Sequence, residues 1–482
     1  MQLNDPSLLK NQCYINGAWV GDGVDVVTNP ANGDVIGKVP NFGTAETRTA
    51  IESAHAAFKP WSKMLAKERG LILRKWYDLI MDNVDDLAMI MTSEQGKPLA
   101  ESKGEIGYAA SFVEFYAEEA RRIYGETIPT FKPDSRVLVT KQPIGVVTAI
   151  TPWNFPAAMI TRKVSPALAV GCTAVIKPAP DTPLTALALA VLAERAGMPS
   201  GVLNIITGDA PAIGKEMCEN QTVRFVGFTG STAVGKLLMQ QAAGTVKRVG
   251  MELGGNAPFI VFDDADIDAA VEGTIASKFR NAGQTCVCAN RIYAQAGVYD
   301  EYLAKLKVAV ENLKVGDGTE AGVTQGPLIN ENAVKKVESH VQDALEKGGE
   351  LLTGGNRHDL GGTFFEPTIV ANATREMRVS TEETFGPLAP VYKFDTEEQV
   401  IGLANDVSAG LAAYFYSRDI GRVWRVAEEL EYGMVAINVG ILASAETPFG
   451  GVKESGIGRE GSHHGVEEFI EMKYMLMSGL DK

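Results

Sequence analysis

The spacing of apolar and polar residues divides the chain into a helical N-terminal part and a following part in which strands and helices alternate. Apolar residues recur at helical intervals over 44–58, 66–91 and 101–124, which predicts three helices. From 135 to 156 the sequence becomes rich in β-branched residues and predicts strands.

A regular alternation of strands and helices follows. We predict strands at 172–178, 201–208 and 223–231, and helices at 182–197 and 232–243. Such β-α-β alternation indicates a parallel sheet that is covered by helices, a Rossmann-like platform for a nucleotide.

A second alternating series begins after the glycine-rich residues 253–255, which we interpret as a hinge. It contains predicted strands at 259–264 and 291–295 and predicted helices at 265–283 and 298–316. We therefore expect a second α/β domain, so the fold class is α/β with two domains.

Composition excludes several classes of protein. The net charge is −15, from 60 acidic and 45 basic residues, and no dense basic run is present to bind nucleic acid. No run of 18 apolar residues predicts a membrane span, and the first residues lack a signal-peptide pattern. The five cysteines, an odd number in a long chain, suggest a reducing compartment, so we expect a cytoplasmic protein.

The segment FTGSTAVGKLL at 228–238 nearly matches a phosphate-binding loop. Gly230, Gly235 and Lys236 have the required spacing, but Leu237 stands where a serine or threonine would bind magnesium. This departure argues against an ATPase. The backbone of such a loop can still bind a phosphate at the start of a helix, or it can be a tight turn only.

Two cysteines lie close together in RNAGQTCVCANR at 280–291. The pair supplies two metal ligands where a structural zinc site needs four, and the five histidines have no metal-binding spacing, so we expect no metal. A thiolate at Cys286 would be a strong nucleophile, and Gly283 to Thr285 could bring backbone N–H groups to an oxyanion. On local sequence alone, both cysteines could equally be buried filler.

Five motifs together resemble the aldehyde dehydrogenase superfamily over nearly the whole chain. They are TPWNFP (151–156), MELGGNAP (251–258), NAGQTC (281–286), EETFGP (382–387) and PFGG (448–451). Within the superfamily, the segments ITRK, KFRNAGQTCVCANR and GREGSHHGVEEF are most similar to succinate-semialdehyde dehydrogenases. The resemblance implies the aldehyde dehydrogenase fold.

The resemblance implies a catalytic role for three residues. Cys286 would attack the aldehyde, and the amide of Asn154 would stabilise the oxyanion beside the backbone N–H of Cys286. The resulting thiohemiacetal would give a hydride to a nicotinamide and become a thioester, and Glu252 would activate the water that hydrolyses it. From the residues alone, Glu252 could instead pair with Lys247 or Arg248.

The resemblance also implies a dinucleotide cofactor. Its expected contacts are Trp153, Lys177, Gly230, Ser231, Gly235, Glu383 and Phe385. Many NAD-preferring relatives have a glutamate three residues after the lysine, where this chain has Pro180, so NADP is favoured. NAD remains the alternative because Asp181, next to Pro180, could repel a 2′-phosphate.

Two arginines match positions that bind the distal carboxylate in succinate-semialdehyde dehydrogenases. Arg162 and Arg280 would clamp this group by charge-assisted hydrogen bonds, unless either forms a structural ion pair. Relatives commonly have a serine at the position of Ala443, so the hydroxyl would have to come from Ser444. Glutarate semialdehyde therefore remains an alternative substrate.

The resemblance further implies a division of the chain into domains. Residues 1–124 and 147–254 would bind the dinucleotide, 255–440 would form the catalytic domain, and 125–146 with 460–482 would form an oligomerisation element. We expect a homodimer or a homotetramer. A non-catalytic relative that only binds a ligand, and a thioester hydrolase, are the alternative functions.

Cys288 has a predicted role in redox regulation. If residues 286 to 288 form a strand, both side chains point to one side with Cα atoms about 6.5 Å apart, near the limit for a disulfide. An oxidant could then inactivate the enzyme reversibly through a Cys286–Cys288 bond. The alternative is that Cys288 only packs in the core.

Overall fold

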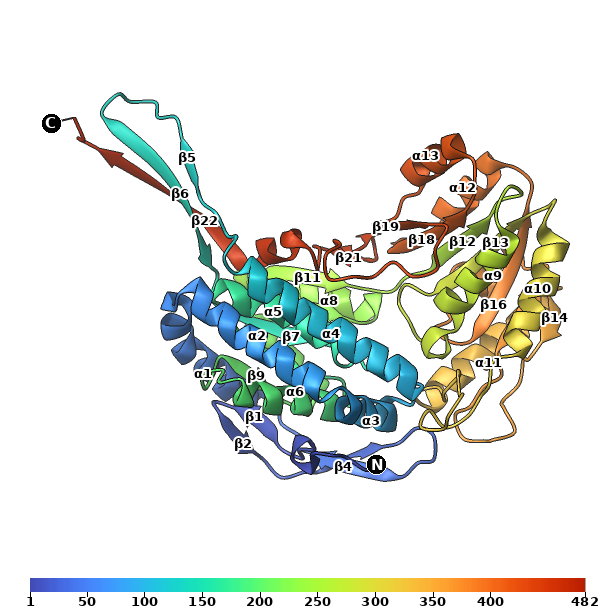
Figure 1. Ribbon diagram of the computed structural model, residues 1–482, viewed down its shortest axis with the longest axis horizontal. Helices are drawn as coiled ribbons and strands as arrows, with labels where there is room; N and C mark the ends of the chain where they lie inside the picture. The colour runs from blue at the N-terminus through green and yellow to red at the C-terminus, as the bar shows by residue number, and fades with distance from the viewer. Residues whose placement is uncertain (482) are drawn as a thin grey trace.

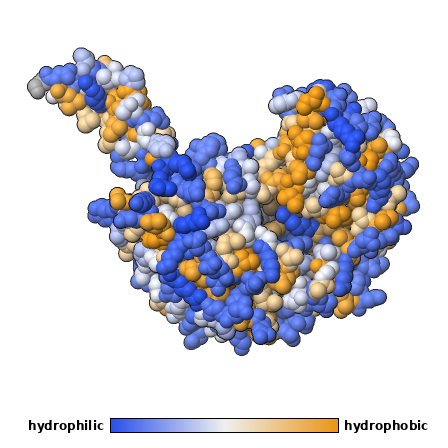
Figure 2. All heavy atoms as spheres, viewed as in Figure 1, coloured by the Kyte–Doolittle hydropathy of each residue, from blue (hydrophilic) through white to orange (hydrophobic). Residues whose placement is uncertain are grey.

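The computed structural model of the protein describes residues 1–481. Two lobes, each built around a β-sheet, lie side by side, and a narrow arm of three strands projects from the first lobe (Figure 1). The surface is hollowed between the two lobes (Figure 2). This arrangement confirms the predicted fold class, a Rossmann-like domain with a second α/β domain and a small β element.

The sheet of the first lobe has eight strands, in the order β2-β1-β9-β8-β7-β10-β11-β21. The strands are β1 (Cys13–Ile15), β2 (Ala18–Val20), β7 (Val146–Ile150), β8 (Thr173–Lys177), β9 (Leu203–Ile205), β10 (Val223–Thr229), β11 (Arg248–Glu252) and β21 (Gly456–Ile457). The pairs from β9 to β11 are parallel, while β1, β2 and β21 add antiparallel edges. In a parallel sheet the strands end at one edge, where ligands usually bind.

The long amphipathic segments of the sequence form helices of the first lobe. They are α1 (Thr44–Lys63), α2 (Ala66–Asp82), α3 (Val84–Gln95), α4 (Leu99–Glu119), α5 (Ala158–Val170), α6 (Leu184–Arg195), α7 (Ala210–Glu219) and α8 (Thr232–Ala242). The single helix expected over 66–91 was wrong, because the chain breaks at Asn83, whose side chain donates to the carbonyl of Leu79. Helix α7 was not predicted.

The sheet of the second lobe has seven strands, in the order β14-β15-β16-β13-β12-β18-β19, and only β14 runs antiparallel. The strands are β12 (Ala257–Val261), β13 (Ala289–Gln295), β14 (Glu350–Thr353), β15 (Thr368–Ala371), β16 (Leu388–Phe394), β18 (Ala412–Tyr416) and β19 (Met434–Ile437). Its helices are α9 (Ile267–Thr274), α10 (Tyr299–Glu311), α11 (Glu331–Glu346), α12 (Glu397–Asn405) and α13 (Ile420–Glu429).

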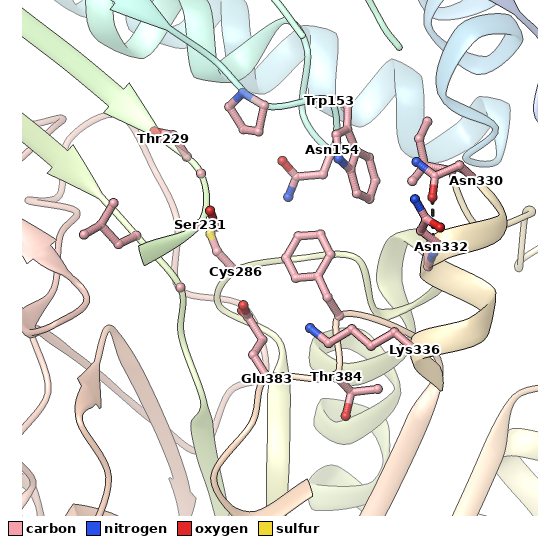
Figure 3. A pocket seen from close by; sticks show the side chains of 17 residues that line it. Trp153, Asn154, Thr229, Ser231, Cys286, Asn330, Asn332, Lys336, Glu383 and Thr384 are labelled. Atoms are coloured by element: carbon pink, nitrogen blue, oxygen red, sulfur yellow. Dashed lines mark hydrogen bonds between the residues drawn. The ribbon is translucent and has the colours of Figure 1, made fainter. Parts of the chain in front are cut away.

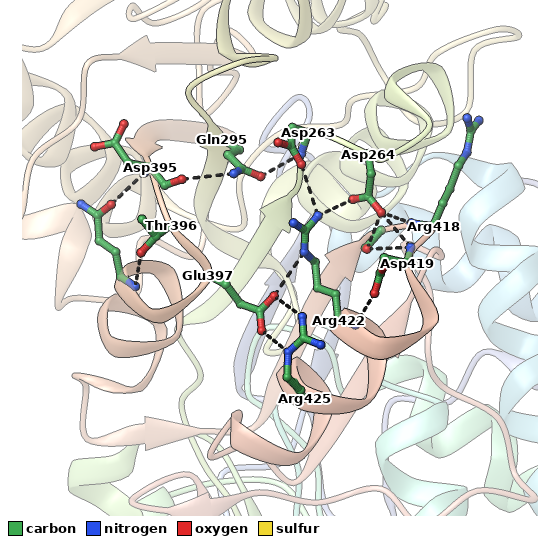
Figure 4. Close-up of polar contacts among 12 residues, drawn as sticks. Asp263, Asp264, Gln295, Asp395, Thr396, Glu397, Arg418, Asp419, Arg422 and Arg425 are labelled. Atoms are coloured by element: carbon green, nitrogen blue, oxygen red, sulfur yellow. Dashed lines mark hydrogen bonds and ion pairs between the residues drawn. The ribbon is translucent and has the colours of Figure 1, made fainter.

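An ionic network ties α12 and α13 to the end of β12 (Figure 4). Arg422 pairs with Asp264 at 2.7 Å, with Asp263 at 3.2 Å and with Glu397 at 3.2 Å. Glu397 also pairs with Arg425 at 2.7 Å, and these two arginines hold the pKa of its carboxyl below the usual range. The network fixes the outer edge of the second lobe and lies apart from the functional site.

The projecting arm consists of β5 (Glu126–Ile128), β6 (Ser135–Pro143) and β22 (Ile470–Ser478), all antiparallel. Ile470 pairs with Pro143 and Ser478 with Ser135, so the two long strands run together over their whole length. Apolar side chains gather on the arm (Figure 2), and they include Ile128, Met472, Tyr474, Leu476 and Met477. The segments 125–146 and 460–482, predicted to mediate oligomerisation, contain these strands, and residue 482 lies outside the described residues.

Short elements complete the described chain. They are the strand pairs β3 (Asp25–Thr28) with β4 (Val35–Val39) and β17 (Ala409–Gly410) with β20 (Val452–Lys453), and the short 3-10 or π helices η1 (Pro6–Leu8), η2 (Ala243–Thr245), η3 (Ile275–Phe279), η4 (Arg280–Gly283), η5 (Arg378–Ser380) and η6 (His463–Phe469). None of the helices between residues 1 and 481 has the length and hydropathy of a transmembrane helix.

Candidate active site

Two cavities meet at Cys286, between the lobes. The larger, of about 370 Å³, is lined by Trp153, Asn154, Gly230, Ser231, Glu383 and Phe385, among others. The smaller, of about 250 Å³, is lined by Lys97, Glu101, Tyr108, Phe155, Arg162, Arg280, Ala443 and Phe449, among others. Within the described chain Cys286 alone lines both cavities, so its thiol can reach a molecule in either one.

A tight reversal of the backbone delivers Cys286 to this position. Instead of the continuous helix expected over 265–283, α9 changes into the π-turn η3 and the 3-10 turn η4. Asn281 and Ala282 both have φ of 52° and Gly283 has φ of 73°, so three residues in a row are left-handed. A Cβ on Gly283 would lie 2.1 Å from the carbonyl oxygen of Gly386, which explains the glycine.

Asn154 is held rigidly beside Cys286. Its side-chain Nδ2 donates to the carbonyl of Gln284 at 3.0 Å, which leaves its second amide N–H for another acceptor. The backbone carbonyl of Asn154 accepts from Lys97 Nζ at 2.6 Å and from Asn281 Nδ2 at 3.0 Å. Lys97 is itself paired with Glu105 at 2.5 Å, and both side chains are buried.

Glu252, the last residue of β11, is buried in a small neighbouring cavity of about 20 Å³. Its Oε2 has no hydrogen-bond partner in the described chain. Burial and the nearby Glu460 carboxylate raise the pKa of Glu252 to about 8, against the cations of Arg162 and Lys163. The carboxylate lines neither of the two larger cavities, so the structure does not place it directly against a molecule bound there.

The simpler alternative for Glu252, a partner among its basic neighbours, is not realised. Lys247 donates to the carbonyl of Asn220 at 2.7 Å, and Arg248 pairs with Glu471 at 3.0 Å. The free carboxyl oxygen of Glu252 therefore has to be explained by something other than a salt bridge.

Burial favours the protonated form of the Cys286 thiol. Burial, together with the carboxylates of Glu383 and Glu252, raises the pKa of the thiol to about 12, while Arg162 and Arg280 act in the opposite direction. A thiolate therefore needs a base to accept its proton when the site is loaded.

The larger cavity has an aromatic wall and a carboxylate. The rings of Trp153 and Phe385 meet edge to face, with centroids 5.6 Å apart at 87°. Glu383 accepts from the backbone N–H of Gly255 at 3.2 Å, and burial raises its pKa to about 7. Trp153 and Asn154 approach the cavity from one side, and Glu383 and Lys336 from the other (Figure 3).

The start of α8 supplies the polar rim of this cavity. Gly230 and Ser231 line it, and the Ser231 side chain caps the helix by accepting from Val234 N–H at 3.4 Å. Gly235, which was predicted to face a pyrophosphate, does not line this cavity. Gly235 is buried one turn into the helix, where a Cβ would lie 2.3 Å from the Leu253 side chain, so it permits close packing of the helix.

Lys177 ends β8 and does not line the larger cavity. Its ammonium donates to the carbonyl of Pro178 at 3.1 Å and forms no ion pair with any residue of the described chain. Burial lowers the pKa of Lys177 to about 8, although Asp181 and Asp209 act against this. Pro180 is exposed and Asp181 is half-buried.

The two predicted substrate arginines differ in their surroundings. Arg162 forms a buried ion pair with Glu460 and its guanidinium lies 4.1 Å over the Phe449 ring. The structural alternative is thus realised for Arg162, although it still lines the smaller cavity. Arg280 lies 5.3 Å over the Phe155 ring and has no ion pair among residues 1–481.

Ser444 does not supply the predicted hydroxyl to the smaller cavity. Its Oγ lies 3.3 Å from the Thr447 hydroxyl in an exposed turn, and Ala443 is the residue that lines the cavity. Successive residues of an extended segment point to opposite sides, so a hydroxyl moved by one position faces away.

Cys288 lies in different surroundings from Cys286. Residues 286–288 form a turn before β13, closed by Cys288 N–H donating to the Thr285 carbonyl at 3.0 Å, so the strand assumed for a disulfide was wrong. The Cys288 thiol is buried and accepts from Lys278 Nζ at 3.3 Å. All five cysteines are free thiols.

Several residues that line the three cavities were not predicted from the sequence. They are Lys97, Glu105, Tyr108, Lys336 and Glu460. Only one signal was available beforehand, because Glu101, Glu105 and Tyr108 have the spacing of one helical face. Polar residues on a predicted helix usually face solvent, so this signal did not distinguish them.

Comparisons with known proteins decide the family. Residues 20–475 match the model of the aldehyde dehydrogenase family. The chain belongs to the aldehyde dehydrogenase family. The solved succinate-semialdehyde dehydrogenase of Burkholderia pseudomallei superimposes with a TM-score of 0.98 at 60% identity, covering 99% of this chain and 100% of that one.

Relatives that resemble this chain equally well are named for different substrates. An NADP-dependent succinate-semialdehyde dehydrogenase of Escherichia coli is 60% identical over 99% of this chain and 100% of that protein. A 3-sulfolactaldehyde dehydrogenase of Pseudomonas putida and a glutarate-semialdehyde dehydrogenase of Pseudomonas aeruginosa are each 59% identical over 100% of both chains. The predicted class of enzyme, an NAD(P)-dependent aldehyde dehydrogenase, is confirmed.

Proposed function

We propose that this aldehyde dehydrogenase oxidises succinate semialdehyde to succinate with NADP. One observation carries the proposal: Cys286 stands at the junction of an aromatic-walled cavity and a second cavity that holds Arg280 without an ion pair. The first cavity fits a nicotinamide nucleotide, and the second fits a short aldehyde with an anionic end. A non-catalytic relative would not need a thiol at this junction.

The residues divide the reaction between them. The Cys286 sulfur forms a bond to the aldehyde carbon, and the carbonyl oxygen becomes an oxyanion that accepts from the Asn154 amide and the Cys286 N–H. NADP held in the larger cavity beside Trp153 and Phe385 would supply the acceptor for the hydride of that carbon, and Cys286 would then hold the acyl group as a thioester. Water then breaks the C–S bond, giving succinate and restoring the thiol.

Glu252 is the proposed base for this hydrolysis. Since its carboxylate lies in the small cavity beside Glu460, it must turn toward Cys286 or act through a water molecule. Its raised pKa suits a base that takes and returns a proton near neutral pH.

Several residues of the larger cavity fit the cofactor. The rings of Trp153 and Phe385 would flank the nicotinamide, Glu383 would accept from its ribose, and the start of α8 at Gly230 and Ser231 would bind a phosphate.

Lys177 would contact the adenosine ribose from outside the lining of that cavity. Pro180 brings no carboxylate to repel a 2′-phosphate, which favours NADP over NAD, and the relative from Escherichia coli is named for NADP. Asp181 is the residue that would restore use of NAD.

Glutarate semialdehyde is the second candidate substrate. Ala443 leaves the smaller cavity without a hydroxyl at that position, which makes room for one more methylene, and one relative bears the corresponding name. The test compares kcat/KM for succinate semialdehyde, glutarate semialdehyde and butanal, with NADP and with NAD. The proposal requires succinate semialdehyde with NADP to be the best pair. A preference for butanal would refute it, and a thioester hydrolase would release acid from thioesters without needing either cofactor.

The remaining expectations belong to the same proposal. The arm formed by β5, β6 and β22 would join subunits into a homodimer or homotetramer, since it exposes apolar side chains away from both lobes. The proposal also includes the predicted domain boundaries and a cytoplasmic location. Oxidation at Cys288 is tested by peroxide followed by dithiothreitol, where equal recovery of wild type and Cys288→Ala would exclude a redox switch.

A further inference from the structure

The smaller cavity contains a buried hydroxyl without an acceptor. Tyr108 lines this cavity, and its Oη is shielded from solvent and donates to no group of the described chain. Helix α4 carries it on the same face as Glu101 and Glu105, so all three side chains are directed at the cavity. Buried polar atoms of native proteins nearly always have a partner, so this one indicates a ligand.

The neighbours of Tyr108 leave its hydroxyl free as a donor. Glu105 is occupied by Lys97 and by the backbone N–H of Ala157 at 3.0 Å, and Glu101 accepts from the backbone N–H of Asn281 at 2.8 Å. Burial raises the pKa of the Tyr108 phenol, although the charge of Arg162 and a hydrogen bond from its guanidinium act against this, so the hydroxyl keeps its proton. Arginine side chains only donate, so neither Arg162 nor Arg280 can accept it.

The missing partner of the Tyr108 hydroxyl therefore has to be a hydrogen-bond acceptor, and the arginines beside it favour one with a negative charge. Arg280 has no ion pair in the described chain, and Arg162 shares its charge with Glu460. An anion between the Tyr108 hydroxyl and the Arg280 guanidinium would satisfy both groups at once. Ala443 and Ser444 supply no hydroxyl here, since the first has none and the second faces Thr447.

We propose that Tyr108 donates a hydrogen bond to the terminal anionic group of the substrate and, together with Arg280, selects ω-anionic aldehydes over neutral ones. This inference rests on the proposed function and adds a specificity residue to it. The bond is made with the end of the substrate opposite the reacting carbonyl, so it does not involve Cys286.

Tyr108→Phe tests the proposal, because it removes the hydroxyl and keeps the ring that packs against Phe112 with centroids 4.9 Å apart. A hydrogen bond to a charged group is worth enough to change KM for succinate semialdehyde by about tenfold or more. The KM for butanal, which offers no acceptor, should change by less than about threefold. The inhibition constant of succinate, measured against the semialdehyde, should rise together with KM.

A matched control separates a ligand contact from a structural one. Tyr302 is also buried, but its hydroxyl lies 2.6 Å from that of Thr274, far along the second lobe. Tyr302→Phe should lower the melting temperature and leave the ratio of the two KM values unchanged. Tyr108→Phe should change the melting temperature much less, because the Tyr108 hydroxyl donates to no group of the described chain.

The outcomes distinguish the two levels of the proposal. If wild type prefers butanal, the proposed function is wrong. If wild type prefers succinate semialdehyde and Tyr108→Phe keeps that preference undiminished, the role of Tyr108 is wrong while the function stands. When Tyr108→Phe is combined with Arg280→Ala, the two losses of binding free energy for succinate semialdehyde should be less than additive, because both residues bind the same anionic group. Full additivity would show that the two residues do not share this group.

Discussion

Replacing Gly255 with alanine should displace the nucleophile without altering any chemical group of the site. A Cβ built on Gly255 lies 2.3 Å from the backbone oxygen of Cys286. Two such atoms normally stay at least about 3.2 Å apart, so the segments must separate by roughly 1 Å. Residues 257 and 289, just beyond each segment, are paired in neighbouring strands of one sheet, which prevents a compensating movement of either backbone.

The expected effect is on the reaction rate. A displacement of roughly 1 Å in the reacting geometry lowers kcat by about 100-fold. The assay is the initial rate of cofactor reduction with saturating succinate semialdehyde, with folding checked by circular dichroism. Gly402→Ala is the matched control, because it lies in α12, a Cβ there meets nothing within 4 Å, and alanine should stabilise the helix slightly. If Gly255→Ala keeps kcat within about threefold of wild type, the positional reasoning is wrong.

Three further predictions follow from buried charges. The pKa of Glu252 is raised to about 8, so the fraction of its carboxylate form, and with it kcat for hydrolysis, should increase as the pH rises through about 8. Glu460→Gln removes a negative charge beside Glu252 and should move this increase to lower pH. An unchanged pH profile would show that Glu460 does not affect the pKa of Glu252. Arg280→Ala should raise KM for succinate semialdehyde by about tenfold or more and leave KM for butanal unchanged, and equal effects would exclude the clamp. Lys97→Met leaves the buried Glu105 carboxylate unpaired and should lower the free energy of unfolding in urea by about 3–5 kcal/mol, while a loss under about 1 kcal/mol would show that the pair contributes little.

The regular elements were predictable because local pattern determines them. The strands at 173–177 and 223–229 and the helices at 184–195 and 232–242 lie within a residue or two of the predicted spans. The two strands and the helix at 184–195 are apolar and mostly buried, and the helix at 232–242 buries one face, so the pattern of apolar residues identifies all four. The break at Asn83 was not predictable from periodicity, because the apolar spacing continues through it.

The residues of the candidate site could be predicted only where they belong to a recognisable sequence motif. Cys286, Asn154 and Glu383 came from motifs, and they do line the cavities. The left-handed turn at 281–283 could not be predicted, because Ala282 in its middle does not favour that conformation.

Contacts between residues that are far apart in the sequence could not be predicted either. Lys163 and Glu460 are 297 residues apart, and the pairing of Glu460 with Arg162 and Lys163 determines both the surroundings of Glu252 and the charge left to Arg162. No local pattern indicates such a pair. The orphan hydroxyl of Tyr108 is likewise visible only once the cavity is assembled.

The central claim is that the Cys286 sulfur carries the acyl group between oxidation and hydrolysis. The most direct test is mass spectrometry of acid-quenched Glu252→Gln enzyme during turnover of succinate semialdehyde with NADP. Slow hydrolysis in this variant should let a succinyl adduct accumulate on the peptide that contains Cys286. Formation of reduced cofactor in the first turnover without any adduct on that peptide would contradict the account.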